Sequence, residues 1–497
     1  MKSQAFATMA AAVFLPFGAV PAQSKASPDT AATIAKVVRA SERKDCRTVQ
    51  KVGAPLLDGA AAGAAEASLA TLYERVAACE LGSGAINRAY GHALRGTARE
   101  GATDKLWRLR LSIENGAGRL AAAVSTVEAM AGHRPAALNG CSSGSIWQLR
   151  DAVKRSGDKA LLRRLLAVLA GDDYRPDDYH GVAPDSHRVA YARLLAEAGD
   201  TEAARRVVAR LETAGGIAAA LLDPTLRGGL PRDADVRQAA ERSLERHRQW
   251  AMAHPDSLGA LIDAAADLRA LGRPDEALAL LDTARARIGD AKAFEDRDEQ
   301  LIWWWNALAK SHRMLGHYEE AVGAYRIGIH VPERDLPGVS LVINLAQAQL
   351  AFGRPEEALQ TLAVFEQPNR RPNGYGAMQM RWPRACAQTR LGHADKAAGD
   401  VAYLLANEKD APQAVSDFYL CSGDLDGAAA SFVRRLADPD LRVEALLDLS
   451  DYDPPPVRFA GDPAASRYPA LKARADVKAA IAKAGGVRRF AVQRGEI

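Results

Sequence analysis

One short phrase recurs along the chain and limits what the chain can fold into. It consists of a glycine, two or three further residues that are mostly polar, an acidic residue and then an alanine. The copies are Gly199–Ala204, Gly272–Ala277, Gly316–Ala321 and Gly353–Ala358, with weaker ones at Gly392–Ala397 and Gly423–Ala428. Glycine ends a helix in the left-handed conformation without a Cβ penalty. Proline or a polar residue, followed by Asp or Glu, favours the start of the next helix. The phrase therefore predicts successive antiparallel helix pairs.

The spacing of the copies supports this interpretation. Successive final alanines lie 73, 44, 37, 39 and 31 residues apart, and a helix pair needs about 34 residues. The first interval is about two units long, which predicts a degenerate repeat there. We expect one of its helices at about 233–253, closed by His254-Pro255.

The remaining sequence also favours helices. Ala, Leu and Arg dominate long stretches, while aromatic residues make up only 6% of the 497 residues, and these abundant residues are strong helix formers. Before the repeats we expect helices at 31–43, 66–80, 106–114, 119–131, 145–155 and 159–170. After them we expect a loop at 451–463, a helical cap at 468–484 and a frayed strand at 487–493. The chain is too long for one compact core.

The unit around Gly316 resembles the tetratricopeptide repeat family. Its matching positions are Trp305, Leu308, Ala309, His312, Ala321, Tyr325 and Pro332. Ala309 and His312 depart from the family pattern, which has Gly and Tyr there. The resemblance implies an all-α fold, a right-handed α-solenoid of antiparallel helix pairs, over residues 185–440. An α-solenoid of another family is the alternative.

The start of the chain is typical of a signal peptide. Ala5 to Val20 is apolar apart from Thr8, and Val20-Pro21-Ala22 fits the cleavage rule. We therefore expect a signal peptide at 1–22, a divergent helical region at 23–184, the repeat array at 185–440 and a cap at 441–497. A membrane anchor is the alternative, although the apolar stretch is short for a span. After cleavage we expect a periplasmic or secreted protein without a membrane span.

An oxidising compartment permits disulfides between the five cysteines. We expect Cys46 to be able to pair with Cys79. Cys386 and Cys421 lie on neighbouring repeats but about one turn apart in register. Because helix axes pack 8–10 Å apart, this offset argues against their pairing.

Catalytic motifs are weak. Gly140-Cys141-Ser142-Ser143-Gly144 matches a nucleophile elbow, but that motif needs a preceding strand, so a loop capping the helix near Ser145 is favoured. The acidic loop at 172–180 lacks the ligand spacing of a known cation loop and is interpreted as a solvated connection. We predict no catalytic residue, metal or cofactor. The 65 basic and 61 acidic residues form no dense basic run, so we expect no nucleic-acid partner.

The resemblance places the candidate site on the first helices of the repeats, which in this family line a concave groove for protein or peptide segments. The candidate residues are Trp303, Asn306, Lys310, Arg313, Ile343, Asn344, Gln347, Trp382, Cys386 and Arg390. Arg and Lys can hold a carboxylate, and Trp and Arg are favoured interface anchors. The alternative is that Trp303 and Trp382 are only packed against neighbouring turns. The expected function is a non-catalytic interaction scaffold. A glycan-handling or hydrolytic enzyme with its site in the N-terminal helices or the acidic loop, and a purely structural subunit, stay open.

Overall fold

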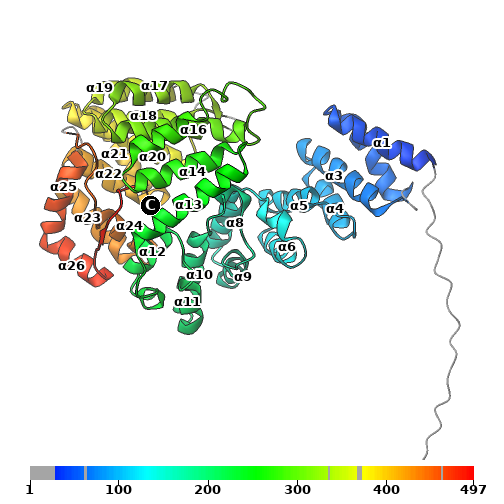
Figure 1. Cartoon of the computed structure of the whole chain (residues 1–497), viewed down its shortest axis with the longest axis horizontal. Coiled ribbons are helices and arrows are strands. Elements are labelled where there is room, and N and C mark those ends of the chain that lie inside the picture. Colours follow the sequence, from blue (N-terminus) through cyan, green and yellow to red (C-terminus); the bar gives the residue numbers. More distant parts are fainter. Residues whose placement is uncertain (1–27, 61–63, 334–335, 367–371, 460–462, 497) are drawn as a thin grey trace, which may run out of the picture. The chain divides into compact units, whose positions relative to one another are not determined.

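The computed structural model describes residues 28–60, 64–333, 336–366, 372–459 and 463–496. The expected signal peptide lies outside these residues. The chain divides into two compact units, residues 1–126 and 127–497, which are described separately (Figure 1). The domain boundary expected at residue 184 stays a prediction.

The first unit is helical. Its elements are α1 (Pro28–Glu42), α2 (Cys46–Thr48), two π-helical turns (Val49–Gly53 and Leu56–Ala60), α3 (Glu66–Gly82), α4 (Ile86–Thr97), α5 (Asp104–Gly116) and the start of α6 (Leu120–His133). Their core is one cluster of buried side chains that includes Val37, Leu72, Val76 and Leu106. Helices were expected at all these places except α2, the π-helical turns and α4.

The second unit continues the succession of helices. It begins with α7 (Pro135–Asn139), α8 (Ser143–Arg155), α9 (Lys159–Leu169), α10 (Asp185–Glu197), α11 (Thr201–Val208), α12 (Ala214–Leu222), α13 (Val236–Ala253), α14 (Leu258–Ala270) and α15 (Pro274–Asp282). It goes on with α16 (Arg297–Met314), α17 (Tyr318–Ile329), α18 (Val339–Ala351), α19 (Pro355–Leu362), α20 (Gly374–Arg390), α21 (Ala394–Ala406), α22 (Pro412–Ser422), α23 (Leu425–Ala437), α24 (Arg442–Leu449), α25 (Pro463–Ala473) and α26 (Ala475–Ala484). The predicted all-α array of sequential antiparallel pairs is confirmed.

The described residues form only four two-residue strands. They are β1 (Pro332–Glu333), β2 (Leu336–Pro337), β3 (Asp451–Tyr452) and β4 (Arg489–Phe490). β1 pairs antiparallel with β2, and β3 pairs parallel with β4. β4 lies within the stretch that was expected to form a frayed strand.

The turn glycines of the repeated phrase adopt the conformation that the sequence predicts. All six have positive φ: Gly199, Gly272, Gly316, Gly353, Gly392 and Gly423. The helix expected at 233–253 also forms, since α13 ends at Ala253 directly before His254. The helix pairs therefore follow from local sequence.

The second unit closes on itself. α12, which follows α7 to α11, packs against α24, near the end of the unit (Figure 1). A single cluster of buried side chains holds residues from both regions, such as Leu222 and Leu244 with Leu446 and Val492. A second cluster joins α18 to α22. We call the contact between α12 and α24, together with the segment 485–492 beside it, the seam.

The segment after α24 is more than a cap on the last repeat, because it returns along the turn glycines. Placing a Cβ on each glycine shows which side chain faces it: Val457 faces Gly316, Arg467 faces Gly423 and Gln493 faces Gly272. The segment therefore contacts three separate repeats. Residues 451–496 thus run back along the array that they follow in sequence.

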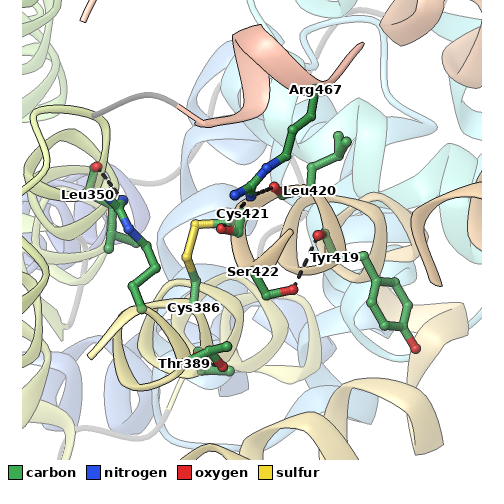
Figure 2. Close-up of a disulfide and its surroundings, with 10 residues drawn as sticks. Leu350, Cys386, Thr389, Tyr419, Leu420, Cys421, Ser422 and Arg467 are labelled. Carbon is green, nitrogen blue, oxygen red and sulfur yellow. Dashed lines mark hydrogen bonds between the residues drawn. A yellow bond between two sulfur atoms is a disulfide. The ribbon is translucent and has the colours of Figure 1, made fainter. Parts of the chain in front are cut away.

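Two disulfides join positions about one repeat apart. One joins Cys46 to Cys79, the pair that the sequence favoured. The other joins Cys386 to Cys421, with 5.8 Å between their Cα atoms (Figure 2). The expectation against this second pair is wrong. Cα atoms lie about 2.3 Å from the helix axis, so facing Cα atoms approach more closely than the axes do.

The Cys386–Cys421 disulfide lies beside the returning segment. Figure 2 shows Arg467 of α25 reaching the carbonyl oxygens of Leu420 and Cys421 at the end of α22. The remaining cysteine, Cys141, is buried, and its thiol donates to the carbonyl of Ala137. The array, its last disulfide and the returning segment are therefore joined at one place.

Among the described residues, no helix is both long and apolar enough to span a bilayer.

Candidate interaction surface

The candidate face begins on α16, where adjacent tryptophans have opposite environments. Trp304 is fully buried, and its indole N–H donates to the carbonyl of Leu281 at 3.1 Å. Trp303 is 36% exposed. Because helix positions three or four apart share a face, Trp303 lies on the side of Asn306 and Lys310.

The neighbouring first helix continues this face. The side-chain amide of Asn344 on α18 donates to the side-chain carbonyl oxygen of Asn306 on α16 at 3.0 Å. Gln347 follows on α18 and is half-buried. Trp303, Asn306 and Asn344 thus form a continuous polar and aromatic patch, which we call the α16–α18 patch.

The remaining candidate residues are packed in the core or bonded to other parts of the chain. Trp382 packs against the second hydrophobic cluster, and its indole N–H donates to the Gln379 side chain at 3.3 Å. Arg390 donates to the carbonyl of Leu350 at 2.9 Å, near the end of α18. Ile343 is buried in the same second cluster. Cys386 is disulfide-bonded to Cys421.

The basic end of the candidate face is occupied by the chain itself. Lys310 lies 4.0 Å from the carboxylate of Glu496. Arg269 of α14 lies 3.1 Å from the same carboxylate. The positive charge of Arg313 also acts on the Glu496 carboxylate. Burial raises the pKa of Glu496, but the charges of Arg269, Lys310 and Arg313 outweigh it, so the pKa is lowered.

Sequence reasoning missed Arg269 and Glu496. Arg269 precedes the turn at Gly272 and was assigned no role, and Glu496 lies outside every helix. The only sequence signal was the expected strand at 487–493, which indicated that this segment pairs with something. Its partner could not be inferred from spacing.

A second charged group surrounds Arg435 of α23, which is 1% exposed. Arg435 donates to Asp448 at 2.7 Å and to the Ser416 hydroxyl at 3.1 Å, and Glu444 lies 3.9 Å away. Asp417 faces the same group. Burial, with the charge of Asp448 next, raises the pKa of Asp417 to about 7. This group was also missed, because its members come from three helices.

The weak catalytic motifs have structural explanations. Ser142 caps α8, since its hydroxyl accepts from the backbone N–H of Ser145 at 3.3 Å. This is the capping loop that the sequence favoured over a nucleophile elbow. No strand precedes it within the described part of the second unit.

The carboxylates of the acidic loop at 172–180 have separate partners. Asp172 pairs with Arg188 and Arg210, and Asp178 accepts from the backbone N–H of Ser143. His180 is buried, with its Nδ1 2.7 Å from Asp263. The carboxylates are exposed as a solvated connection requires, but the loop is anchored. The described residues contain no group of three His, Cys, Asp or Glu side chains placed to hold a metal.

A cavity of about 380 Å³ lies at the seam, between α13 and residues 487–491. Its three arginines already have partners. Arg237 donates to the carbonyl of Ala491, Arg488 to that of Leu221, and Arg489 to Asp453. Their charges therefore contribute to closing the seam.

Comparison with known families bears on the helix pairs. The family model described as tetratricopeptide repeat matches residues 186–210, 258–283 and 339–363. These segments coincide with the pairs α10–α11, α14–α15 and α18–α19. These three helix pairs therefore match the tetratricopeptide repeat. The matched pairs flank α16–α17, where the residue pattern predicted the clearest tetratricopeptide copy.

Similarity to solved structures is weak. One, described as "Structure of Naa15/Naa10 bound to HypK-THB", is 15% identical with a TM-score of 0.26; the match covers 84% of this chain and 65% of that one. The chain thus spans less than two thirds of its length. Another, described as "Crystal structure of APC/C hetero-tetramer Cut9-Hcn1", is 11% identical with a TM-score of 0.29, covering 84% and 97%. No curated protein matches the chain. The tetratricopeptide assignment rests on the matched segments and the helix pairs.

Proposed function

We propose that the second unit is a protein-interaction scaffold that binds a partner segment through the α16–α18 patch. The observation that supports this proposal is the exposure of Trp303, a large aromatic side chain beside the hydrogen-bonded pair Asn306 and Asn344. Exposed tryptophans are favoured interface anchors, and polar side chains beside them fix the register of a bound segment. Tetratricopeptide arrays commonly use first helices in this way.

A crosslinking experiment tests this function. The photoreactive residue p-benzoylphenylalanine replaces Trp303 in one protein and Ile327 in a matched control. Ile327 is 51% exposed but lies on α17, the second helix of the same pair. We expect a discrete crosslinked partner from position 303 that the protein with the photoreactive residue at position 327 does not capture. Identical products from positions 303 and 327, or none from 303, would contradict the proposal.

We further propose that the protein acts outside the cytoplasm. The apolar stretch from Ala5 to Val20 and the cleavage pattern ending at Ala22 motivate this. The two disulfides support it, because disulfides persist in oxidising compartments. Intact-mass measurement of protein recovered from cell fractions tests it. Loss of residues 1–22 in the extracytoplasmic fraction is expected, whereas an uncleaved cytoplasmic product would refute export.

A further inference from the structure

The net positive charge of the described chain is concentrated in the first unit. Residues 28–126 hold 14 basic and 10 acidic side chains, whereas residues 127–497 hold 49 and 51. Within the first unit the excess lies in one short stretch, residues 36–51, where six exposed cations accompany only two carboxylates. We call these six cations the basic patch: Lys36, Arg39, Arg43, Lys44, Arg47 and Lys51.

Helix α1 carries three of these cations in one row. Lys36, Arg39 and Arg43 follow one another at intervals of three and four residues, so their side chains lie on the same side of the helix. Ile34 and Val37 lie on the opposite side and are buried in the core of the first unit. α1 therefore turns its apolar side to the core and three positive charges to solvent.

The segment after α1 carries the other three cations and is fastened to α3. The Cys46–Cys79 disulfide joins this segment to α3. The side-chain amide of Gln50 adds a hydrogen bond to the carbonyl of Cys79 at 2.7 Å. These two links hold the cations of the segment on a rigid support.

Asp45 connects the two parts of the basic patch. Hydrogen bonding with Thr48 is the main reason why the pKa of Asp45 is lowered, and the charges of Arg43 and Arg47 lower it further. Both guanidinium groups therefore act on one carboxylate, one from the end of α1 and the other from α2. The row on α1 and the segment after it thus form one continuous basic surface.

The basic patch has no ion-pair partner among the residues that the structure describes. Other cations of the first unit are paired: Arg95 lies 3.2 Å from Asp58, and Arg99 lies 2.6 Å from Glu66. A group of like charges without counter-charges repels itself in the isolated protein. An anionic partner would relieve this repulsion.

The patch lacks the anchors of a protein or nucleic-acid interface. Residues 36–51 contain no aromatic residue, whereas protein interfaces are anchored by Trp and Tyr and single-stranded nucleic acids stack on aromatic side chains. No large apolar side chain is exposed in the described part of residues 28–60 either. A lipid surface with anionic headgroups needs only charge, and clusters of about four to eight Lys and Arg on an amphipathic helix recognise it.

We propose that the basic patch is a docking surface for a membrane that contains anionic phospholipid. The attachment is peripheral and electrostatic, because headgroup phosphates supply the missing counter-charges and no apolar side chain of the patch enters the hydrocarbon. The proposal goes beyond partner binding at the α16–α18 patch, which belongs to the second unit. Attachment of the first unit would keep the covalently joined scaffold near the membrane surface.

Vesicle co-sedimentation tests the proposal. The protein begins at Gln23, because the apolar stretch from Ala5 to Val20 would bind lipid by itself, and it keeps every described helix. The probes are vesicles of phosphatidylcholine alone and vesicles in which about a third of the lipid is phosphatidylglycerol. We expect binding only to the anionic vesicles. It should weaken at least about tenfold in about 0.5 M salt, which screens exposed charges.

A triple variant locates the binding. Lys36→Gln/Arg39→Gln/Arg43→Gln removes the row on α1, and circular dichroism establishes that it is folded. Each Lys or Arg near an anionic surface raises membrane partitioning about fivefold. We therefore expect the triple variant to bind anionic vesicles at least about tenfold more weakly than the wild type.

The matched control removes the same charge from the second unit. Lys396→Gln/Lys478→Gln/Lys483→Gln changes three exposed lysines and should bind as the wild type does. No binding to anionic vesicles, equal binding to both kinds of vesicle, an unaffected α1 variant or an equal loss in the control overturns the proposal. Tighter binding of a single-stranded oligonucleotide than of anionic vesicles would also overturn it and assign the patch to nucleic acid. Crosslinking at position 303 is measured separately, so the two proposals fail independently.

Discussion

The guanidinium of Arg269 lies 3.1 Å from the carboxylate of Glu496, although 227 residues separate them in sequence. This pair joins α14 to the segment that follows the last helix.

Removing one partner of a buried ion pair leaves an uncompensated charge, which costs about 3–5 kcal/mol. We expect Arg269→Met to lower the free energy of unfolding by about 3 kcal/mol in urea titrations. Arg285→Met, which removes an exposed pair with Asp282, should cost no more than about 0.5 kcal/mol; equal costs would contradict a buried linkage.

The adjacent tryptophans should separate stability from binding. Trp304→Ala removes a fully buried side chain and its hydrogen bond to Leu281, so we expect a loss of about 4 kcal/mol. Trp303→Ala should change the unfolding free energy by less than about 0.5 kcal/mol while abolishing partner capture. Thermal unfolding of both proteins, and affinity capture of the crosslinked partner by each, check both statements. A destabilised Trp303→Ala protein would show that this side chain is structural.

Asp417 should make stability depend on pH. Its pKa is raised to about 7 in the folded protein, by burial first and Asp448 next, whereas an unfolded Asp has a pKa near about 3.9. Folding therefore favours the protonated form, and its contribution is lost as pH rises through 7. We expect Asp417→Asn to match wild type at pH 4 and to exceed it by about 2 kcal/mol at pH 8. A pKa of about 7 in place of about 3.9 corresponds to about 4 kcal/mol, but the amide also loses the attraction of Arg435. Equal stabilities at pH 8 would contradict the raised pKa.

Cysteine labelling should distinguish the disulfide pattern. Under denaturing, non-reducing conditions we expect one maleimide adduct, on Cys141, and five after reduction. The 35-residue separation of Cys386 and Cys421 predicts that Cys386→Ala/Cys421→Ala costs about 3–4 kcal/mol, because the crosslink restricts the unfolded chain. Intact mass and urea titration measure the two quantities. Three adducts before reduction would show that one disulfide is absent.

Two turn glycines test the returning segment. Gly157 and Gly316 have nearly the same φ, +77° and +78°, but a Cβ at Gly157 meets nothing, whereas one at Gly316 lies 3.2 Å from Val457. Alanine at either position incurs the left-handed penalty of about 1–2 kcal/mol. We expect Gly316→Ala to cost about 1 kcal/mol more than Gly157→Ala. In the double variant Gly316→Ala/Val457→Ala the extra cost of the glycine change should vanish, relative to Val457→Ala alone; persistence would place the segment elsewhere.

The helix pairs could be predicted from sequence because their determinants are local. A turn glycine such as Gly272 and the acidic residue after it act within a few residues of each other. The disulfide Cys386–Cys421 was mispredicted because the separation of the helix axes was taken for the separation of the Cα atoms. The alignment of Trp303, Asn306 and Lys310 on one side of α16 could be predicted, since helical periodicity fixes which side chains align; their role in binding stays a prediction.

The partner of Lys310 could not be predicted in the same way. Glu496 follows the last helix and lies 186 residues after Lys310 in sequence, so no local pattern relates the two. The charged group around Arg435 was missed for the same reason, because its carboxylates come from α22 and α24.

Closure of the second unit constrains how such a chain can evolve. In an open array each repeat contacts only its neighbours, so a duplicated pair can be inserted without disturbing distant ones. Here an extra pair between α12 and α24 would change the rotation that brings those two helices together. It would expose the core that Leu222 shares with Leu446. The seam therefore disfavours insertion of a further helix pair between α12 and α24, whereas substitutions and changes in loops leave it intact.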